Sequence, residues 1–249
     1  MDLTYRAHKV VREDRADGSI LLTSGYEMSP VAARTGDWVD RWAREAPERV
    51  FIAERSGAGW REVSYAETRE RVRALAAALL ARGMGPETPI VVISGNGVDH
   101  GLLTLAAQYV GVPTVPLAEQ YALIPEARGQ LRHCVEVVRP AMVFADDGER
   151  YGDALALEIF EGLEKVVSRN VRAGMTALET MTGGSDVGVD AAAQEVGPDT
   201  VAKFLMTSGS TSHPKAVVTT QRMMCANQAQ LLDALPFLGE KPPRIVDWL

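Results

Sequence analysis

The sequence has few cysteines, no long apolar run and no excess of positive charge. Its 249 residues include two cysteines, Cys134 and Cys225, whose spacing matches no metal-binding pattern. Two thiols without a signal-peptide core at the N-terminus indicate reduced, structural residues in a cytoplasmic protein. No run approaches the roughly 18 apolar residues of a membrane helix. The formal net charge of −7 argues against a general nucleic-acid-binding surface.

Apolar runs alternate with helical patterns through the middle of the chain. Strands are predicted at 89–94, 113–117, 141–145 and 165–168, and helices at 98–110, 130–138 and 154–162, with a loop at 118–125. Unbroken apolar strands are typical of a parallel sheet that is covered on both faces. The sequence therefore predicts an α/β fold with a mostly parallel sheet flanked by helices.

The first third of the chain carries clear local signals. Residues 1–33 are weakly periodic and are interpreted as an extension that lies on the body of the protein. A helix at 38–44 is predicted to be capped by Asp37. Strands at 50–53 and 60–63 are predicted to form a hairpin. Ser64 and Glu67 predict a capping box at the start of a long helix, on which we expect a solvated basic face formed by Arg69, Arg71 and Arg73.

A glycine-containing turn, Ser94–Gly97, leads from a strand into a helix. Such a turn invites comparison with the dinucleotide-binding pattern Gly-x-Gly-x-x-Gly, but His100 stands where the third glycine is needed. We interpret the turn as structural and His100 as a packed or exposed histidine.

A hydroxyl-rich loop between two apolar strands is the strongest functional feature. The flanking strands are predicted at 201–206 and 217–220. Gly209 lets backbone N–H groups approach a ligand, and Lys215 supplies a positive charge. Hydroxyl side chains that can donate hydrogen bonds stand at Thr207, Ser208, Ser210, Thr211 and Ser212. This composition predicts a site for a polyanion such as a triphosphate.

Two other interpretations of the loop were weighed. A Ser/Gly-rich surface linker has the same composition, although linkers are seldom enclosed by apolar strands. A Walker A loop requires Gly-x-x-x-x-Gly-Lys-[Ser/Thr] at the start of a helix. Here Lys215 follows Pro214 and precedes a strand, which excludes that motif.

The loop resembles the phosphate loop of the adenylate-forming family, which includes acyl- and aryl-CoA synthetases, luciferases and peptide-synthetase adenylation domains. The matching pattern is Thr207-Ser208-Gly209-Ser210-Thr211-x-x-Pro214-Lys215-x-Val217. Residues 220–228 and 242–249 are similar to the feruloyl-CoA synthetase branch. The resemblance runs from roughly Arg34 onward and covers the front portion of such an enzyme.

The resemblance implies a fold, a reaction and a site. Residues 1–33 are then an N-terminal extension, and 34–249 an incomplete N-terminal AMP-binding domain whose phosphate loop spans 207–215. The implied enzyme converts an aryl or acyl carboxylate and ATP to an acyl-adenylate and pyrophosphate with Mg²⁺, and then forms a thioester with CoA. The residues implied to hold the β- and γ-phosphates are Thr207, Ser208, Gly209, Ser210, Thr211, Ser212 and Lys215.

Two positions depart from the family pattern. Ser212 and Ala216 stand where the family usually has glycine. If position 212 needs a positive φ, serine costs on the order of 1 kcal/mol there. The methyl group of Ala216 would hinder a close backbone approach. We therefore predict weaker phosphate binding than a double-glycine loop would give.

The last residues, Arg244–Leu249, are interpreted as a strand that stops in mid-element. The family's later motifs and its C-terminal domain are then expected to be absent, and the exposed sheet edge to associate with a partner. Two alternatives to an active ligase remain. The first is a truncated nucleotide-phosphate-binding module without turnover, and the second is a non-enzymatic α/β domain.

Overall fold

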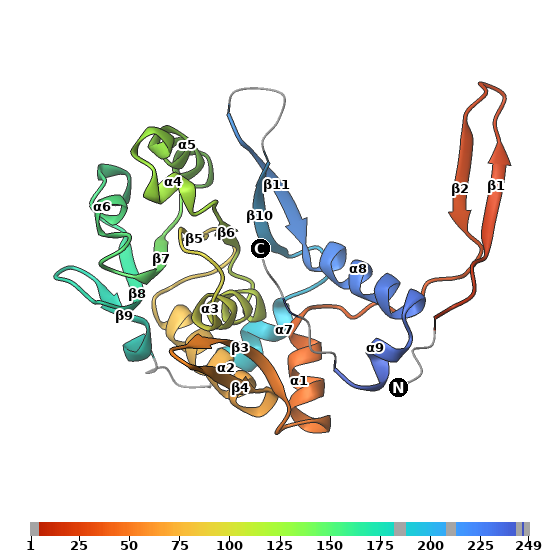
Figure 1. Cartoon of the computed structure of the whole chain (residues 1–249), viewed down its shortest axis with the longest axis horizontal. Helices are drawn as coiled ribbons and strands as arrows, with labels where there is room; N and C mark the ends of the chain where they lie inside the picture. Colours follow the sequence, from red (N-terminus) through yellow and green to blue (C-terminus); the bar gives the residue numbers. More distant parts are fainter. Residues whose placement is uncertain (1–4, 182–187, 208–212, 243–245, 247–249) are drawn as a thin grey trace.

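A seven-stranded, mostly parallel sheet forms the centre of the protein (Figure 1). The computed structural model describes residues 5–181, 188–207, 213–242 and 246, and within them the strand order is β11-β10-β6-β5-β7-β8-β9. All neighbours pair in parallel except β10 and β11. The strands are β5 (Ile90–Val92), β6 (Thr114–Pro116), β7 (Met142–Asp147), β8 (Glu164–Arg169), β9 (Thr176–Ala177), β10 (Val201–Thr207) and β11 (Lys215–Thr220). The predicted α/β fold with a mostly parallel sheet is confirmed.

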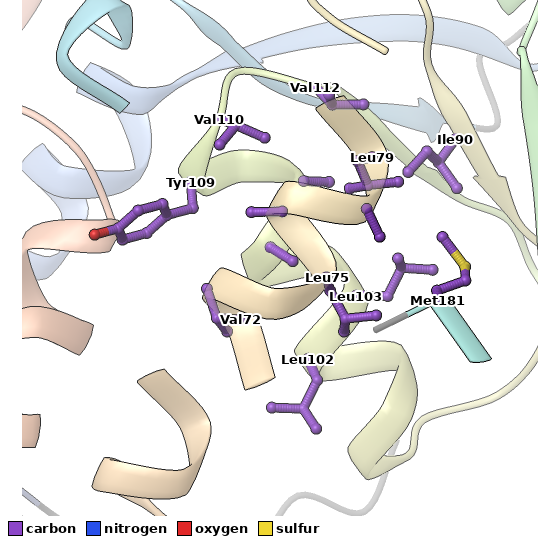
Figure 2. Packing of buried hydrophobic residues seen from close by; sticks show 14 of the residues in the cluster. Val72, Leu75, Leu79, Ile90, Leu102, Leu103, Tyr109, Val110, Val112 and Met181 are labelled. Carbon is purple, nitrogen blue, oxygen red and sulfur yellow. The ribbon is translucent and has the colours of Figure 1, made fainter. Parts of the chain in front are cut away.

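Helices cover both faces of this sheet and bury a separate core on each. Alternate residues of a strand point to opposite faces, so Ile90 and Val92 join one core while Val91 and Ile93 join the other. The first core packs α2 (Tyr65–Ala81), α3 (Val98–Tyr109) and α7 (Val189–Glu195) on the sheet, and Figure 2 shows Leu75 and Leu79 of α2 among its side chains. The second packs α5 (Arg128–Val138) and α6 (Gly152–Leu155) on the opposite face.

The helix α2 confirms one local prediction and corrects another. Ser64 Oγ accepts from the Glu67 N–H at 3.3 Å, and Glu67 accepts from the Ser64 N–H at 2.8 Å, which is the predicted capping box. The expected solvated basic face is wrong for Arg73, whose side chain is 12% exposed and bonds Asp190 of α7 at 2.6 Å. The Arg69 side chain is 43% exposed and bonds Asp40 of α1 (Gly36–Glu45) at 2.8 Å. These arginines tie neighbouring helices to α2.

The N-terminal segment was expected to lie on the body, and this is wrong for its hairpin. The strands β1 (Val10–Asp14) and β2 (Ile20–Ser24) pair only with each other and project away from the sheet (Figure 1). Gly18 closes the hairpin with a φ of +82°, a conformation that glycine adopts readily. The base of this arm touches the body, where Ser29 bonds Asp233 of α8 (Gln221–Ala234) at 2.5 Å.

Several element boundaries differ from prediction. The helix α1 begins after Thr35, so Asp37 lies in its first turn and is not its cap. The expected loop at 118–125 contains α4 (Gln120–Leu123). The expected helix at 154–162 is replaced by two shorter elements, α6 and a 3₁₀ turn at Glu158–Phe160, because the backbone of Leu157 between them is extended. The hairpin of β3 (Val50–Ser56) and β4 (Gly59–Ser64) is confirmed, and α9 (Phe237–Glu240) follows α8.

The stretch before residue 196 contains α7, which buries Val189 and Ala193 completely or nearly so. The strand predicted at 244–249 lies outside the described residues, apart from Val246. None of the described helices combines the length and hydrophobicity that crossing a bilayer requires.

Candidate functional site

Polar residues gather where the parallel strands end. The strand β7 ends in Asp146 and Asp147, and β8 ends in Arg169. Because β10 runs parallel to β6, with Lys203 opposite Thr114, Thr207 at the end of β10 lies on this same carboxyl edge. Ligands of open α/β sheets bind at this edge. The topology therefore brings the hydroxyl-rich loop to the edge where a ligand site is expected.

The loop joins two antiparallel strands, β10 and β11. Thr207 and Lys215 face each other as the last pair of the ladder, and Lys215 is exposed. These are the two predicted phosphate-binding residues that the structure describes and brings together. The other predicted site residues, Ser208, Gly209, Ser210, Thr211 and Ser212, lie outside the described residues.

The strand β10 is largely apolar, as its sequence indicates, but only part of it is buried. Ala202 is fully buried, whereas Leu205 is 36% exposed. The reason is position, because β10 and β11 form one end of the sheet. Phe204 and Met206 are half-buried and pack against the core beneath α5.

The helix α5 reaches the residues that leave the loop. The Nε2 atom of His133 lies 2.9 Å from the carbonyl oxygen of Pro214. The His133 ring also lies against the His213 ring, with centroids 4.8 Å apart and planes inclined by 32°. Sequence reasoning did not single out His133 for this role, because 81 positions separate it from Pro214 and no local pattern links the two.

Asp147 organises the ends of β7 and β8. The residue is 9% exposed, and its carboxylate accepts from the N–H groups of Glu149 and Arg150, from Asn170 and from Arg169. Burial raises the pKa of this carboxyl, but these hydrogen bonds outweigh it and hold the pKa well below its ordinary value. For the neighbouring Asp146, burial raises the pKa. Asp147 therefore carries a stable charge that fixes the turn after β7.

A second polar group lies on the rim near Gly95. Glu119, just before α4, accepts from the Tyr151 hydroxyl at 2.7 Å and from Arg150. A side chain at Gly95 would meet the Glu119 carboxylate, since a Cβ there would lie 3.2 Å from its oxygen. The hydrogen bonds of Glu119 therefore join the segment after β6 to the turn after β7, close to Gly95.

The turn before α3 is structural, as expected. Helix N-termini attract anions, and here the Val98 N–H donates to the Glu54 carboxylate at 2.9 Å. The position that a dinucleotide phosphate would occupy is therefore taken by a side chain. His100 Nδ1 donates to Gly95 O at 3.2 Å, and burial lowers the pKa of its ring. A polar cavity of about 130 Å³ adjoins it, lined by Glu54, Arg61, Gly97, Asp99, His100, Asp146, Ser168 and Arg169.

The base of the β10–β11 hairpin is held by Gln221, the first residue of α8. Its side chain is fully buried, accepts from the Thr35 N–H at 2.9 Å and donates to Gln108 O at 3.1 Å. Its own N–H donates to Thr200 O at 3.0 Å. The hairpin thus leaves and rejoins the body at one fixed point, and the pair of Thr207 and Lys215 lies at the other end of its ladder.

Residues 39–241 match the sequence model of a family described as AMP-binding enzyme. The chain belongs to the AMP-binding enzyme family. Phenyloxazoline synthase MbtB of Mycobacterium sp. (strain MCS) is 30% identical over 232 residues, which are 93% of this chain and 17% of that protein. A methyl-dioxo-octahydroindenyl-propanoyl:CoA ligase of Mycobacterium tuberculosis is 27% identical over 193 residues, which are 77% of this chain and 37% of that protein.

Solved structures of other AMP-binding enzymes and luciferases share the fold. A natural red emitting luciferase from Phrixothrix hirtus superposes with a TM-score of 0.67 at 17% identity, covering 84% of this chain and 40% of its own. A fatty acyl-adenylate ligase from L. pneumophila, solved with acyl adenylate and pyrophosphate, gives a TM-score of 0.62 at 16% identity, covering 80% and 32%. The observed α/β architecture therefore matches the N-terminal domain of adenylate-forming enzymes.

The matched relatives are much longer than this AMP-binding family member. The chain spans between 1% and 37% of the length of the six curated proteins that it matches. The names of these proteins include two hybrid PKS-NRPS synthetases and a CoA ligase, and they do not single out the feruloyl-CoA synthetase branch.

Proposed function

We propose that this chain is the nucleotide-phosphate-binding portion of an AMP-forming acid–thiol ligase. The full reaction would join a carboxylate to ATP, releasing pyrophosphate, and then transfer the acyl group from the adenylate to the thiol of CoA, releasing AMP. Membership of the AMP-binding family supports this reaction class.

The observation that carries the proposal is the placement of the hydroxyl-rich loop. It leaves the carboxyl end of β10, and Lys215 closes it directly opposite Thr207. Residues 207–212 and 215 would hold the β- and γ-phosphates through hydroxyl and backbone donors, with Lys215 as a positive charge. Charge-assisted hydrogen bonds contribute roughly 1.5–3 kcal/mol each, so a few of them suffice to bind a triphosphate.

The loop would act on the leaving group of the first step. Negative charge develops on pyrophosphate as the carboxylate attacks the α-phosphorus, and fixed donors around the departing oxygens stabilise that charge. The described residues contain no cluster of three metal-ligating side chains. Mg²⁺ usually binds through substrate phosphates and few carboxylates, so it would enter with ATP and add positive charge there.

For the acid, we propose an aryl carboxylate of the ferulate type. Residues 220–228 and 242–249 support this choice through their similarity to the feruloyl-CoA synthetase branch. We place the protein in the cytoplasm, because Cys134 and Cys225 are both free and buried, as structural thiols of a reducing compartment are.

Calorimetric titration with Mg-ATP and with pyrophosphate tests the proposal. The wild type is expected to bind both, and Lys215→Ala to bind each about tenfold or more weakly, since it loses one charge-assisted contact. Lys241→Ala removes another exposed lysine and serves as the matched control. Equal affinities of wild type and Lys215→Ala would contradict the assigned role of the loop.

A second candidate is binding without turnover. It is favoured by the two predicted phosphate-binding residues that the structure describes, Thr207 and Lys215, which offer contacts to phosphate and no group that reacts. Release of AMP from ATP with ferulate, CoA and Mg²⁺ separates the two. AMP release that depends on ferulate and falls in Lys215→Ala supports the ligase, whereas ATP binding without AMP release supports the binding module.

A further inference from the structure

One contact near the loop is assigned to no part of the proposed reaction. The helix α5 is anchored in the second core by Leu131, Cys134 and Val135, which are 6% exposed or less. His133 lies on the side of this helix that contacts β11. A firmly anchored helix thus presents an imidazole to the strand at the edge of the sheet.

The chemistry of the contact fixes which group donates. A carbonyl oxygen only accepts hydrogen bonds, so His133 Nε2 carries the hydrogen and donates to Pro214 O at 2.9 Å. The His213 ring lies against the His133 ring, 4.8 Å away. Two successive residues in the last part of the loop, His213 and Pro214, are therefore held by one side chain.

The hydrogen bond to Pro214 also restrains the backbone of Lys215, because the two residues share a peptide bond. The Pro214 carbonyl belongs to the same planar peptide group as the Lys215 nitrogen. The ladder fixes Lys215 on its other side by pairing it with Thr207. Together these two contacts set the direction in which Lys215 leaves the strand.

We propose that His133 is a positioning residue, which aims Lys215 at the terminal phosphates of ATP by holding the Pro214–Lys215 peptide. The inference rests on the proposed phosphate-binding function of the loop. His133 needs no contact with the nucleotide to act in this way. Its contribution is to prevent the exposed edge strand from turning its lysine away from the ligand.

Two variants separate the hydrogen bond from the ring contact. His133→Phe keeps an aromatic ring against His213 but cannot donate, whereas His133→Gln retains an N–H donor. Because one hydrogen bond contributes only a small net free energy, His133→Phe is expected to weaken pyrophosphate binding about 2- to 10-fold. His133→Gln should regain most of that loss. Glu136→Gln, an exposed change on the same helix, is the matched control.

A double-mutant cycle decides whether His133 acts through Lys215. If it does, His133→Phe has little further effect on pyrophosphate affinity in the Lys215→Ala background. Amide hydrogen exchange should also quicken in residues 213–220 of His133→Phe, while α5 keeps its wild-type rates. A purely structural role would lower affinity equally in both backgrounds, and this additive result would overturn the proposal.

The remaining outcomes are also decisive. Wild-type affinity in His133→Phe, with weak binding in Lys215→Ala, would overturn the role of His133 and leave the function of the loop standing. Absence of binding by the wild type would overturn both. Failure of His133→Phe to fold would show in its melting transition. In that case His133→Gln is compared with Glu136→Gln. Because His133→Gln retains a donor, its pyrophosphate affinity and the amide exchange rates of 213–220 should stay near the wild-type values, and a clear loss of either would overturn the proposal.

Discussion

At the residue scale, Asp147 is a nearly buried carboxylate that stays charged because four neighbouring groups donate to it. Its pKa is held below the ordinary value, which is about 3.9 in an unfolded chain. Below roughly pH 4 the unfolded chain binds a proton at Asp147 that the folded chain does not bind. Its contribution to stability is therefore complete above that pH and declines as the pH falls.

This gives a pH prediction. Between pH 4 and pH 2, the unfolding free energy of the wild type should fall more steeply than that of Asp147→Asn, by up to about 1.4 kcal/mol per pH unit. Urea unfolding at pH 2, 3 and 4 measures the slopes. Asp153→Asn removes an exposed carboxylate nearby and serves as the control. Parallel curves for wild type and Asp147→Asn would contradict the assigned charge state.

Ser212 and Ala216 lead to a second prediction, about the loop. Ser212→Gly should tighten pyrophosphate binding about fivefold if the position uses a positive φ, because glycine removes a penalty on the order of 1 kcal/mol. Ala216 lies within β11 opposite Met206, where glycine weakens a strand by roughly 0.5–1 kcal/mol. The gain from Ala216→Gly should therefore be smaller, and titration calorimetry compares the two. No gain from Ser212→Gly would remove the argument for strain there.

Some site residues could be predicted from the sequence because they form a local pattern, and others could not because their partners are distant in the chain. The loop pattern at 207–215 is local, so composition and order sufficed to mark it as a candidate. His133, Gln221 and Asp147 act across the fold through partners that are 22 to 186 positions away. Such contacts arise only once helices and strands have packed, and no local pattern encodes them.

At the element scale, helix starts were predictable where a side chain caps its own helix. The Ser64–Glu67 box is such a case, because both partners lie within one turn. The short helices α4, α6 and α7 were missed or misplaced, since each is too brief for periodicity and is set by packing. The central parallel strands β5 to β8 were predicted close to their observed bounds because burial makes them largely apolar, whereas the two-residue strand β9 was missed.

The capping box of α2 is expected to contribute measurably to stability. Ser64→Ala removes the acceptor for the Glu67 N–H and should lower the unfolding free energy by about 1 kcal/mol. Denaturant unfolding measures the change, with Ser56→Ala at the exposed end of β3 as control. An unchanged midpoint in Ser64→Ala would show that the cap contributes nothing to stability.

The two described hairpins outside the main sheet should differ in amide hydrogen exchange. The β1–β2 arm has no buried residue, and an isolated two-stranded hairpin is marginally stable. The β3–β4 hairpin buries Val63 and contacts α2 and α3. Amides of 10–24 should therefore exchange well before those of 50–64 at neutral pH. Equal protection of both hairpins would mean that the arm is held by contacts of its own.

At the scale of the whole molecule, the sheet carries two cores that share the same strands. Leu79 fills the core beneath α2 and Leu131 the core beneath α5, and both are fully buried. Leu79→Ala and Leu131→Ala should each lower the unfolding free energy by about 2–5 kcal/mol. Because the strands couple the faces, both variants should shift one common transition, and far-ultraviolet circular dichroism and fluorescence should coincide. Separate transitions would show that the faces unfold independently.

The hydrogen bond between Thr200 and Gln221 brings together the two ends of residues 201–220. This stretch contains both strands of the hairpin and the entire candidate phosphate loop. It therefore has the properties of an exchangeable cassette, because its two ends meet at one point of the fold. Evolution, or an engineer grafting the loop of a relative, could alter the nucleotide chemistry by replacing one contiguous stretch, provided that the new residues keep the contacts with β6 and α5.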